Sequence, residues 1–312
     1  MKSVLKKFLS MFITLFVVSF LAFAAFAVIP GDPALMRLKT NATPEAVEAL
    51  RHSYGLDRPF LTRYFSWVSG LLMGDMGTSY TYSAPVSEII RSKLMVTLYL
   101  TALAFVIMTL ISIPVAVHCA KNDGGLTDRV ISAVNQVFMS VPPFFAGIII
   151  TYIFGIGLRL FVPGGYVPFE DDPAGFIYYM FFPAFAVAIP KIAVSVRLLK
   201  STIMKESKKD YVRTAYSRGE RGNTVLYRHV IWNAMIPAVT FYAMQFVDMI
   251  AGSIITEQVF SIPGLGRILL TSIEGRDYPV VLAVLMCVAV AAVIADTVSD
   301  LGVIALDPRI RE

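Results

Sequence analysis

The sequence predicts an all-α integral membrane protein with six transmembrane helices. Its 312 residues are 56% hydrophobic and have a mean hydropathy of +0.69, far above the values of a soluble domain. Charged residues make up only 16% of the chain and cluster between long uncharged stretches. Since about 20 apolar residues suffice to cross a bilayer as a helix, each of these stretches is a candidate span.

The first expected span covers residues 8–29, which carry no charge and follow three lysines near the N-terminus. A cleaved signal peptide is the alternative, because Ala25 and Ala27 would suit a cleavage site. The apolar stretch is longer than a usual signal core, which favours a retained span. Residues 30–93 then form the largest segment outside the membrane, with helices expected over 43–52 and 59–70.

Five further spans are expected over residues 94–117, 130–158, 174–199, 231–255 and 280–304. The adjacent Pro142 and Pro143 should kink or break the third span, because proline lacks a backbone donor. Such a break is tolerated where protein or a water-filled path satisfies the freed carbonyls, although a kink used only for packing is an equal alternative. Pro183 and Pro190 are expected to break the fourth span.

The distribution of basic residues predicts the orientation. The proposed inside segments hold 15 lysines and arginines, and the two short outside loops hold three. The positive-inside rule then places both termini in the cytoplasm. Lys191 and Arg197 are expected near the inner end of the fourth span, where they can snorkel. The chain thus divides into the first helix with its outside segment (1–93), a five-helix core (94–306) and a cytoplasmic tail (307–312).

Residues 200–237 are the one long polar interruption in the C-terminal half. Within them, residues 210–219 are expected to form a helix capped by Asp210 and ended by Gly219 in the left-handed conformation. Its apolar face would carry Tyr211, Val212, Ala215 and Tyr216, and its polar face Arg213, Thr214, Ser217 and Arg218. Two turns, about 12 Å, are too short to be stable alone, so this helix should dock against something. A plain basic loop is the alternative.

The motif DYVRTA at 210–215, followed by Gly219, Arg228-His229, Asn233-Ala234 and Ile236-Pro237, resembles the membrane subunits of binding-protein-dependent ABC importers. Their signature is Glu-Ala-Ala, three residues, then Gly. Arg213 and Thr214 depart from it as the dipeptide, oligopeptide and nickel branch does. Further branch motifs are IPGDPA at 29–34, YGLDRP at 54–59, GDMGTS at 74–79, PVSEII at 85–90, SIPGLGR at 261–267 and RDYP at 276–279.

This resemblance implies a type I importer permease bundle with an extracytoplasmic insertion after the first helix. The chain would be the first, B-type, permease of a pair in a bacterial or archaeal plasma membrane. It would work with a second permease subunit, two ATPase subunits that bind ATP and Mg, and an extracytoplasmic substrate-binding protein. The helix at 210–219 would couple to the ATPases through Asp210, Tyr211, Val212, Arg213, Thr214, Ala215, Tyr216 and Gly219. Peptides are the first cargo hypothesis, with nickel chelates, glutathione or another small solute as alternatives.

The sequence lacks a Walker A loop, and no catalytic triad or metal-ligand spacing is evident. We therefore expect no enzymatic activity and no cofactor or metal in this chain. The net charge of +5 does not indicate nucleic acid, because the basic residues lie where topology requires them. An ion-gradient transporter, the alternative of another class, would need a carboxylate within the membrane.

Asp248 in the fifth span is such a carboxylate, and Gln245 lies three residues before it on the same face. Three interpretations of Asp248 remain open: pairing with a partner subunit, contact with cargo along the translocation path, and proton transfer. Pro142, Pro143, Gln245 and Asp248 are accordingly the candidate path residues.

Overall fold

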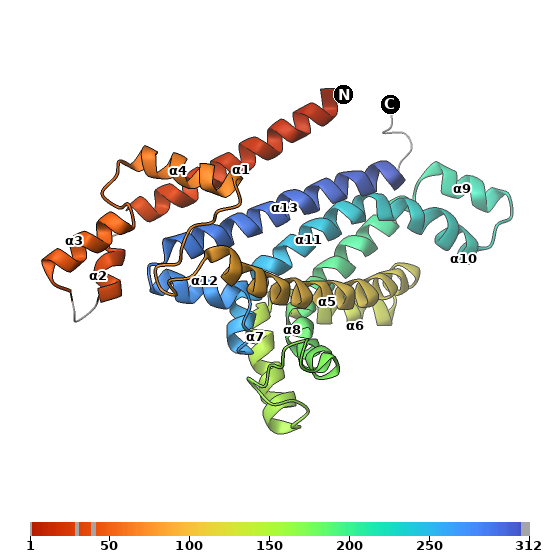
Figure 1. The fold of residues 1–312 in the computed structure, drawn as a ribbon. Helices are drawn as coiled ribbons and strands as arrows, with labels where there is room; N and C mark the ends of the chain where they lie inside the picture. The colour runs from red at the N-terminus through yellow and green to blue at the C-terminus, as the bar shows by residue number, and fades with distance from the viewer. Residues whose placement is uncertain (1, 29–30, 39–41, 307–312) are drawn as a thin grey trace. The chain divides into compact units, whose positions relative to one another are not determined.

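The computed structural model describes residues 2–28, 31–38 and 42–306, and within them the regular elements are helical, apart from one isolated bridge between Thr78 and Pro85 (Figure 1). The predicted tail at 307–312 lies outside the described residues. The elements are α1 (Lys2–Val28), α2 (Pro33–Leu38), α3 (Pro44–Ser53), α4 (Phe60–Leu72), α5 (Val86–Lys121), α6 (Leu126–Ser140), α7 (Pro143–Ile150), the π-helical η2 (Thr151–Gly157), α8 (Pro173–Glu206), α9 (Asp210–Ser217), α10 (Gly222–Val225), the π-helical η3 (Leu226–Val230), α11 (Ile231–Val259), α12 (Leu265–Glu274) and α13 (Tyr278–Leu306).

The all-helical membrane class predicted from the sequence is confirmed. Among the described residues, five helical stretches are long and apolar enough to cross a membrane: Leu9–Val28, Val86–Lys121, Pro173–Glu206, Gly222–Val259 and Tyr278–Asp300. A sixth span arises if α6 and the α7–η2 helix are counted together, and these are bent by 102° where Pro142 and Pro143 interrupt them. The predicted break at the two prolines is therefore confirmed.

The chain divides into two compact units. The first comprises residues 1–97 and 263–293, and the second residues 98–262 and 294–312. In the first unit, α1 and α4 lie side by side around a core of Phe23, Tyr64 and Leu282 (Figure 1). The Ser19 and Tyr64 hydroxyls, 2.9 Å apart, share a hydrogen bond within this contact.

The short helices of the first unit form where the local sequence signals predict them. Helix α3 begins after Thr43, whose side chain accepts from the Ala46 N–H, with Pro44 as its first residue. Helix α4 begins directly after Pro59. Helix α12 was not expected: Gly264 precedes it, and the Leu265 N–H donates to the Thr97 hydroxyl at 2.8 Å.

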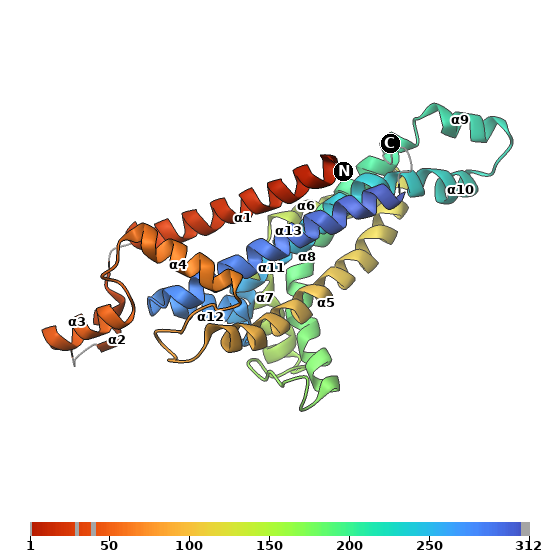
Figure 2. The same ribbon diagram turned by 45° about the horizontal axis from the view of Figure 1, so that its top comes forward.

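In the second unit, α8 is the central helix, and α6, α7 and α11 pack against it (Figure 2). The expectation that Pro183 and Pro190 break this span is wrong, because α8 runs unbroken through both. Both prolines are buried among the neighbouring helices, and such surroundings compensate the hydrogen bonds that proline removes. The sequence predicted Lys191 near the inner end of this span. Because α8 continues to Glu206, Lys191 instead lies at the middle of the helix.

Candidate functional site

Helix α9 is the element that the sequence marks as the coupling helix, and its start differs from the expectation. Lys209 is the N-cap residue, and no side chain caps this end. Asp210 is instead the first helical residue, so its predicted capping role is wrong. Its carboxylate still lies in the first turn, where negative charge interacts favourably with the helix dipole.

The end of α9 forms as the sequence predicts. Gly219 has a φ of +82°, the left-handed conformation. The Gly219 N–H donates to the Tyr216 carbonyl at 2.9 Å, and the Glu220 N–H donates to the Ala215 carbonyl at 3.3 Å. These two bonds form a Schellman motif, which satisfies carbonyls left free at the helix end.

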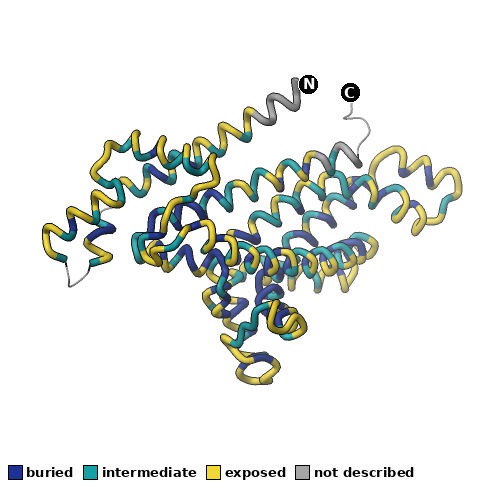
Figure 3. The backbone as a smooth tube through the Cα atoms, in the orientation of Figure 1, coloured by how far each residue is buried: buried dark blue, intermediate teal, exposed yellow. Residues whose placement is uncertain are grey.

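Helix α9 lies beyond the adjoining ends of α8 and α11, and most of its surface is exposed (Figures 1 and 3). The predicted apolar face is divided between two roles. Val212 and Ala215 are only 2% and 7% exposed and pack within their own chain. Tyr211 and Tyr216 are exposed, together with Arg213, Thr214 and Ser217 of the polar face. An outside partner would therefore meet the tyrosines and the polar residues, and not the whole apolar stripe.

A hydrogen-bonded chain fastens α9 to the helices on either side of it. The Tyr211 hydroxyl donates to Glu206 Oε1 at 3.0 Å, at the end of α8. Asn233 Nδ2, at the start of α11, approaches the same hydroxyl at 3.4 Å and donates to the His229 carbonyl at 2.7 Å. Partial burial, and then Glu206, raise the pKa of Tyr211 to about 12, so this phenol remains a donor at neutral pH.

A second contact closes the turn that follows α9. Glu220 Oε2 and His229 Nε2 lie 3.0 Å apart, joining the residue after Gly219 to the η3 turn. Lys209 Nζ pairs with Glu206 Oε2 at 2.8 Å on the other side. Both ends of α9 are thus attached to neighbouring helical segments of the same chain, α8 and η3.

The candidate path residues lie on α7 and α11. Pro142 is the N-cap residue of α7 and Pro143 its first residue. A Cβ placed on Gly252 of α11 would lie 4.0 Å from Pro143 Cγ, so the start of α7 approaches α11 one turn after Asp248. Among the described residues, Gln245 Oε1 is buried and has no hydrogen-bond partner.

Asp248 forms an ion pair with Lys191 of α8. Of the three interpretations, pairing was expected with a partner subunit, but the basic residue comes from the same chain. The sequence did not indicate Lys191 as the partner, because it predicted this residue near the inner end of the span. Its position directly after Pro190, inside an apolar stretch, is the signal that it lies at the middle of the helix.

Two motifs of the first unit, GDMGTS and RDYP, are brought together by Asp277. This carboxylate is fully buried and accepts from the Ser79 hydroxyl at 2.5 Å, the Tyr80 N–H at 3.0 Å and the Thr81 N–H at 3.1 Å. No local sequence signal predicts a contact between residues almost 200 positions apart, so this contact was not expected. Asp277 fixes the loop before α5 to the start of α13.

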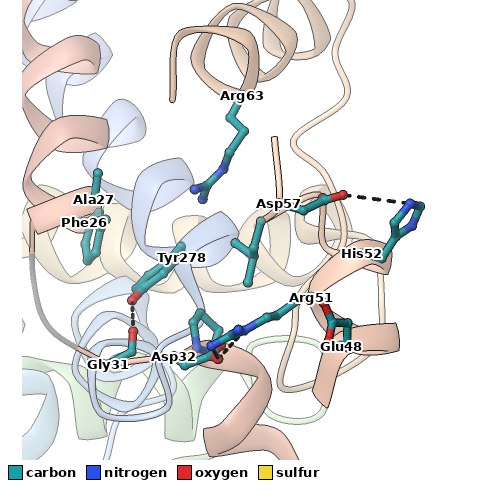
Figure 4. A pocket seen from close by; sticks show the side chains of 12 residues that line it. Phe26, Ala27, Gly31, Asp32, Glu48, Arg51, His52, Asp57, Arg63 and Tyr278 are labelled. Carbon is teal, nitrogen blue, oxygen red and sulfur yellow. Dashed lines mark hydrogen bonds and ion pairs between the residues drawn. The ribbon is translucent and has the colours of Figure 1, made fainter. Parts of the chain in front are cut away.

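A pocket of about 440 Å³ also lies in the first unit, next to the end of α1 (Figure 4). Asp32 forms an ion pair with Arg51 across its floor, with Nη2 to Oδ2 at 2.5 Å, and Arg63 points into it from α4. Gly31 and Tyr278 also line the pocket, and the Tyr278 hydroxyl donates to the Gly31 carbonyl at 3.4 Å. Within the described ranges, no group of three His, Cys, Asp or Glu residues is arranged to hold a metal ion.

Two family descriptions together match almost the whole chain. The Binding-protein-dependent transport system inner membrane component matches residues 112–312, and the N-terminal domain of the same component matches residues 1–102. The chain is 30% identical to the Probable peptide ABC transporter permease protein y4tP of Sinorhizobium fredii, over 99% of this chain and 98% of that protein.

Two further relatives are similar over nearly their full length. The Oligopeptide transport system permease protein AppB of Bacillus subtilis is 31% identical over 94% of both chains. The Glutathione transport system permease protein GsiC of Escherichia coli is 31% identical over 99% of this chain and 98% of the relative. With both of its halves matched, the chain belongs to the family of inner membrane components of binding-protein-dependent ABC transport systems.

Proposed function

We propose that this chain is a permease subunit of an ATP-driven importer and forms part of the translocation path for peptides. The observation that carries the proposal is the similarity, over 99% of this chain, to a relative named as a peptide permease. Glutathione is the second candidate cargo, because a relative similar over the same length is named for its transport. Both cargoes contain peptide-like backbones and charged termini.

The proposed machine has four other components: a second permease subunit, two ATPase subunits and an extracytoplasmic substrate-binding protein. The ATPases bind ATP and Mg, and this chain contributes no catalysis. Helix α9 is the proposed contact with an ATPase. Its exposed Tyr211, Arg213, Thr214 and Tyr216 would form the contact surface, while Val212 and Ala215 hold the helix in its own chain.

Uptake by the complete complex tests the function. In proteoliposomes containing all five proteins, we expect ATP-dependent uptake of dipeptides or short oligopeptides, with the binding protein on the outside. Glutathione and a nickel chelate serve as alternative cargoes in parallel reactions. Saturable uptake of either alternative without any peptide uptake would contradict the peptide assignment, and uptake driven by a proton gradient without ATP would contradict the importer class.

Six spans with both termini in the cytoplasm complete the proposal, with the α6 and α7–η2 helices counted as one broken span. The exposed Asp171 then lies outside and the exposed Lys208 inside. In a variant whose Cys119 and Cys287 are replaced by alanine, a membrane-impermeant thiol reagent should label Asp171→Cys in intact cells. Lys208→Cys should react only after the cells are opened, and its labelling from outside would contradict this topology.

A further inference from the structure

The Lys191–Asp248 pair lies near the middle of two helical stretches that are long and apolar enough to cross a membrane. Lys191 follows the start of α8 by 18 residues and precedes its end by 15. Asp248 follows the start of α11 by 17 residues and precedes its end by 11. At 1.5 Å per residue, both side chains are about 15 Å or more from either helix end. Ionised groups at such depth face the interior of a bundle or a water-filled cavity.

The two members of the pair differ in exposure. The Lys191 side chain is 16% exposed, whereas the Asp248 side chain is 58% exposed. Lys191 contacts only Oδ2, and Oδ1 accepts no hydrogen bond from the described residues. The buried lysine therefore compensates the charge of the carboxylate, while the open side of the carboxylate remains able to accept.

Asp248 lies on an exposed stripe of α11 that includes Met244, Ala251 and Ile255. Their spacing of four, three and four residues places them along one side of the helix. Lipid contact along this stripe would expose the carboxylate to hydrocarbon at large cost. The stripe is consequently the side of α11 that requires an aqueous path or another polar surface.

Two acceptor oxygens on this part of α11, Asp248 Oδ1 and Gln245 Oε1, have no donor among the described residues. Gln245 Oε1, one turn before Asp248, is buried with no hydrogen-bond partner among the described residues. Two acceptors one turn apart match a ligand with several donors and a positive charge, such as a primary ammonium group. They do not match an anion, because neither oxygen can donate a hydrogen bond to it.

We propose that Asp248, paired with Lys191 and assisted by Gln245, binds the ammonium group of the cargo in the translocation path. The proposal rests on the proposed importer function and adds a charge selectivity to it. The ligand class is a solute with a free primary amine, such as the amino terminus of a peptide. Lys191 is a positioning residue, and Asp248 makes the contact.

A charge-selective labelling experiment tests the site without assuming the cargo. Ala251→Cys places a thiol one turn after Asp248, in the complete complex with Cys119 and Cys287 replaced by alanine. We expect a cationic methanethiosulfonate reagent to react about tenfold faster than its anionic counterpart, a difference equivalent to about 1.4 kcal/mol. The ratio should fall to about one when Asp248→Asn is added. A ratio near one in the parent, or no reaction at all because lipid or a partner covers position 251, would overturn the proposal.

The cargo contact itself is tested by protection and by uptake. Dialanine delivered by the binding protein should slow labelling of Ala251→Cys, whereas N-acetylated dialanine should not. Asp248→Asn should lower ATP-dependent dialanine uptake about tenfold, an effect again equivalent to about 1.4 kcal/mol, while Met244→Leu on the same stripe leaves uptake unchanged. Equal protection by both compounds would overturn the contact.

A double variant separates binding from simple structural pairing. Lys191→Asp combined with Asp248→Lys preserves an ion pair but reverses the charge presented to cargo. Full dialanine uptake by this variant would mean that the pair is only structural. If the unmodified complex shows the tenfold ratio of labelling rates but no peptide uptake, the proposed peptide function is contradicted and the acidic site is retained. The failure of one proposal can therefore be distinguished from the failure of the other.

Discussion

Replacing Gly219 with valine should abolish the coupling between ATP hydrolysis and cargo uptake. The φ of +82° at this position is strongly unfavourable for a β-branched residue. A Cβ at Gly219 would meet no other atom within 4 Å, so the expected effect comes from the backbone conformation and not from crowding. Without the left-handed residue the Schellman bonds to Tyr216 and Ala215 are lost, and the exposed face of α9 is no longer held in place.

The measurement is cargo-stimulated ATP hydrolysis by the complete complex in proteoliposomes. We expect Gly219→Val to reduce stimulation to the basal rate while insertion and assembly persist. Gly219→Asn is the matched control, because asparagine tolerates positive φ better than other non-glycine residues and should retain most of the stimulation. Normal stimulation in Gly219→Val would rule out α9 as the coupling element.

The second large effect is expected for Asp277→Ala. The substitution removes a fully buried carboxylate that accepts from one buried hydroxyl and two part-buried backbone N–H groups. Each donor left unpaired costs roughly 1–3 kcal/mol, so the local loss should be on the order of 3 kcal/mol or more. The loop at 79–82 should detach from the start of α13.

Limited proteolysis from the outer side, and hydrogen exchange at the Tyr80 and Thr81 amides, would measure this loss. Asp75→Ala is the control, because Asp75 is exposed and its Oδ1 accepts a bond from the nearby Gly77 N–H at 2.8 Å. We expect little change for the control. Wild-type exchange at both amides in Asp277→Ala would show that the buried carboxylate does not hold the loop.

Local signals in the sequence predicted the elements whose causes are local. Thr43 and Pro44 mark the start of α3, Gly219 marks the end of α9, and Pro142-Pro143 marks the break before α7. In each case the deciding interactions lie within a few residues, so propensity and backbone chemistry suffice.

Features that depend on packing could not be predicted in this way. Pro183 and Pro190 look like breaks in a single helix, but the surrounding helices keep α8 continuous. The Lys191 partner of Asp248, and the Ser79 partner of Asp277, are 57 and 198 residues away in the chain. The spacing of Val212 and Ala215 predicted that they lie on an apolar docking face of α9. Spacing does not tell whether such a face contacts the same chain or a partner, and both residues are buried within their own chain.

The continuity of α8 has a mechanical consequence. One unbroken helix carries Lys191 at its middle and Glu206, to which Tyr211 of α9 is bonded, at its end. The separation of 15 residues corresponds to about 23 Å along the axis. A rigid rod turns as a whole, so a torque applied at α9 would rotate Lys191 relative to Asp248 without passing through a flexible hinge. The proposed ammonium site and the proposed ATPase contact would then be connected by one continuous helix.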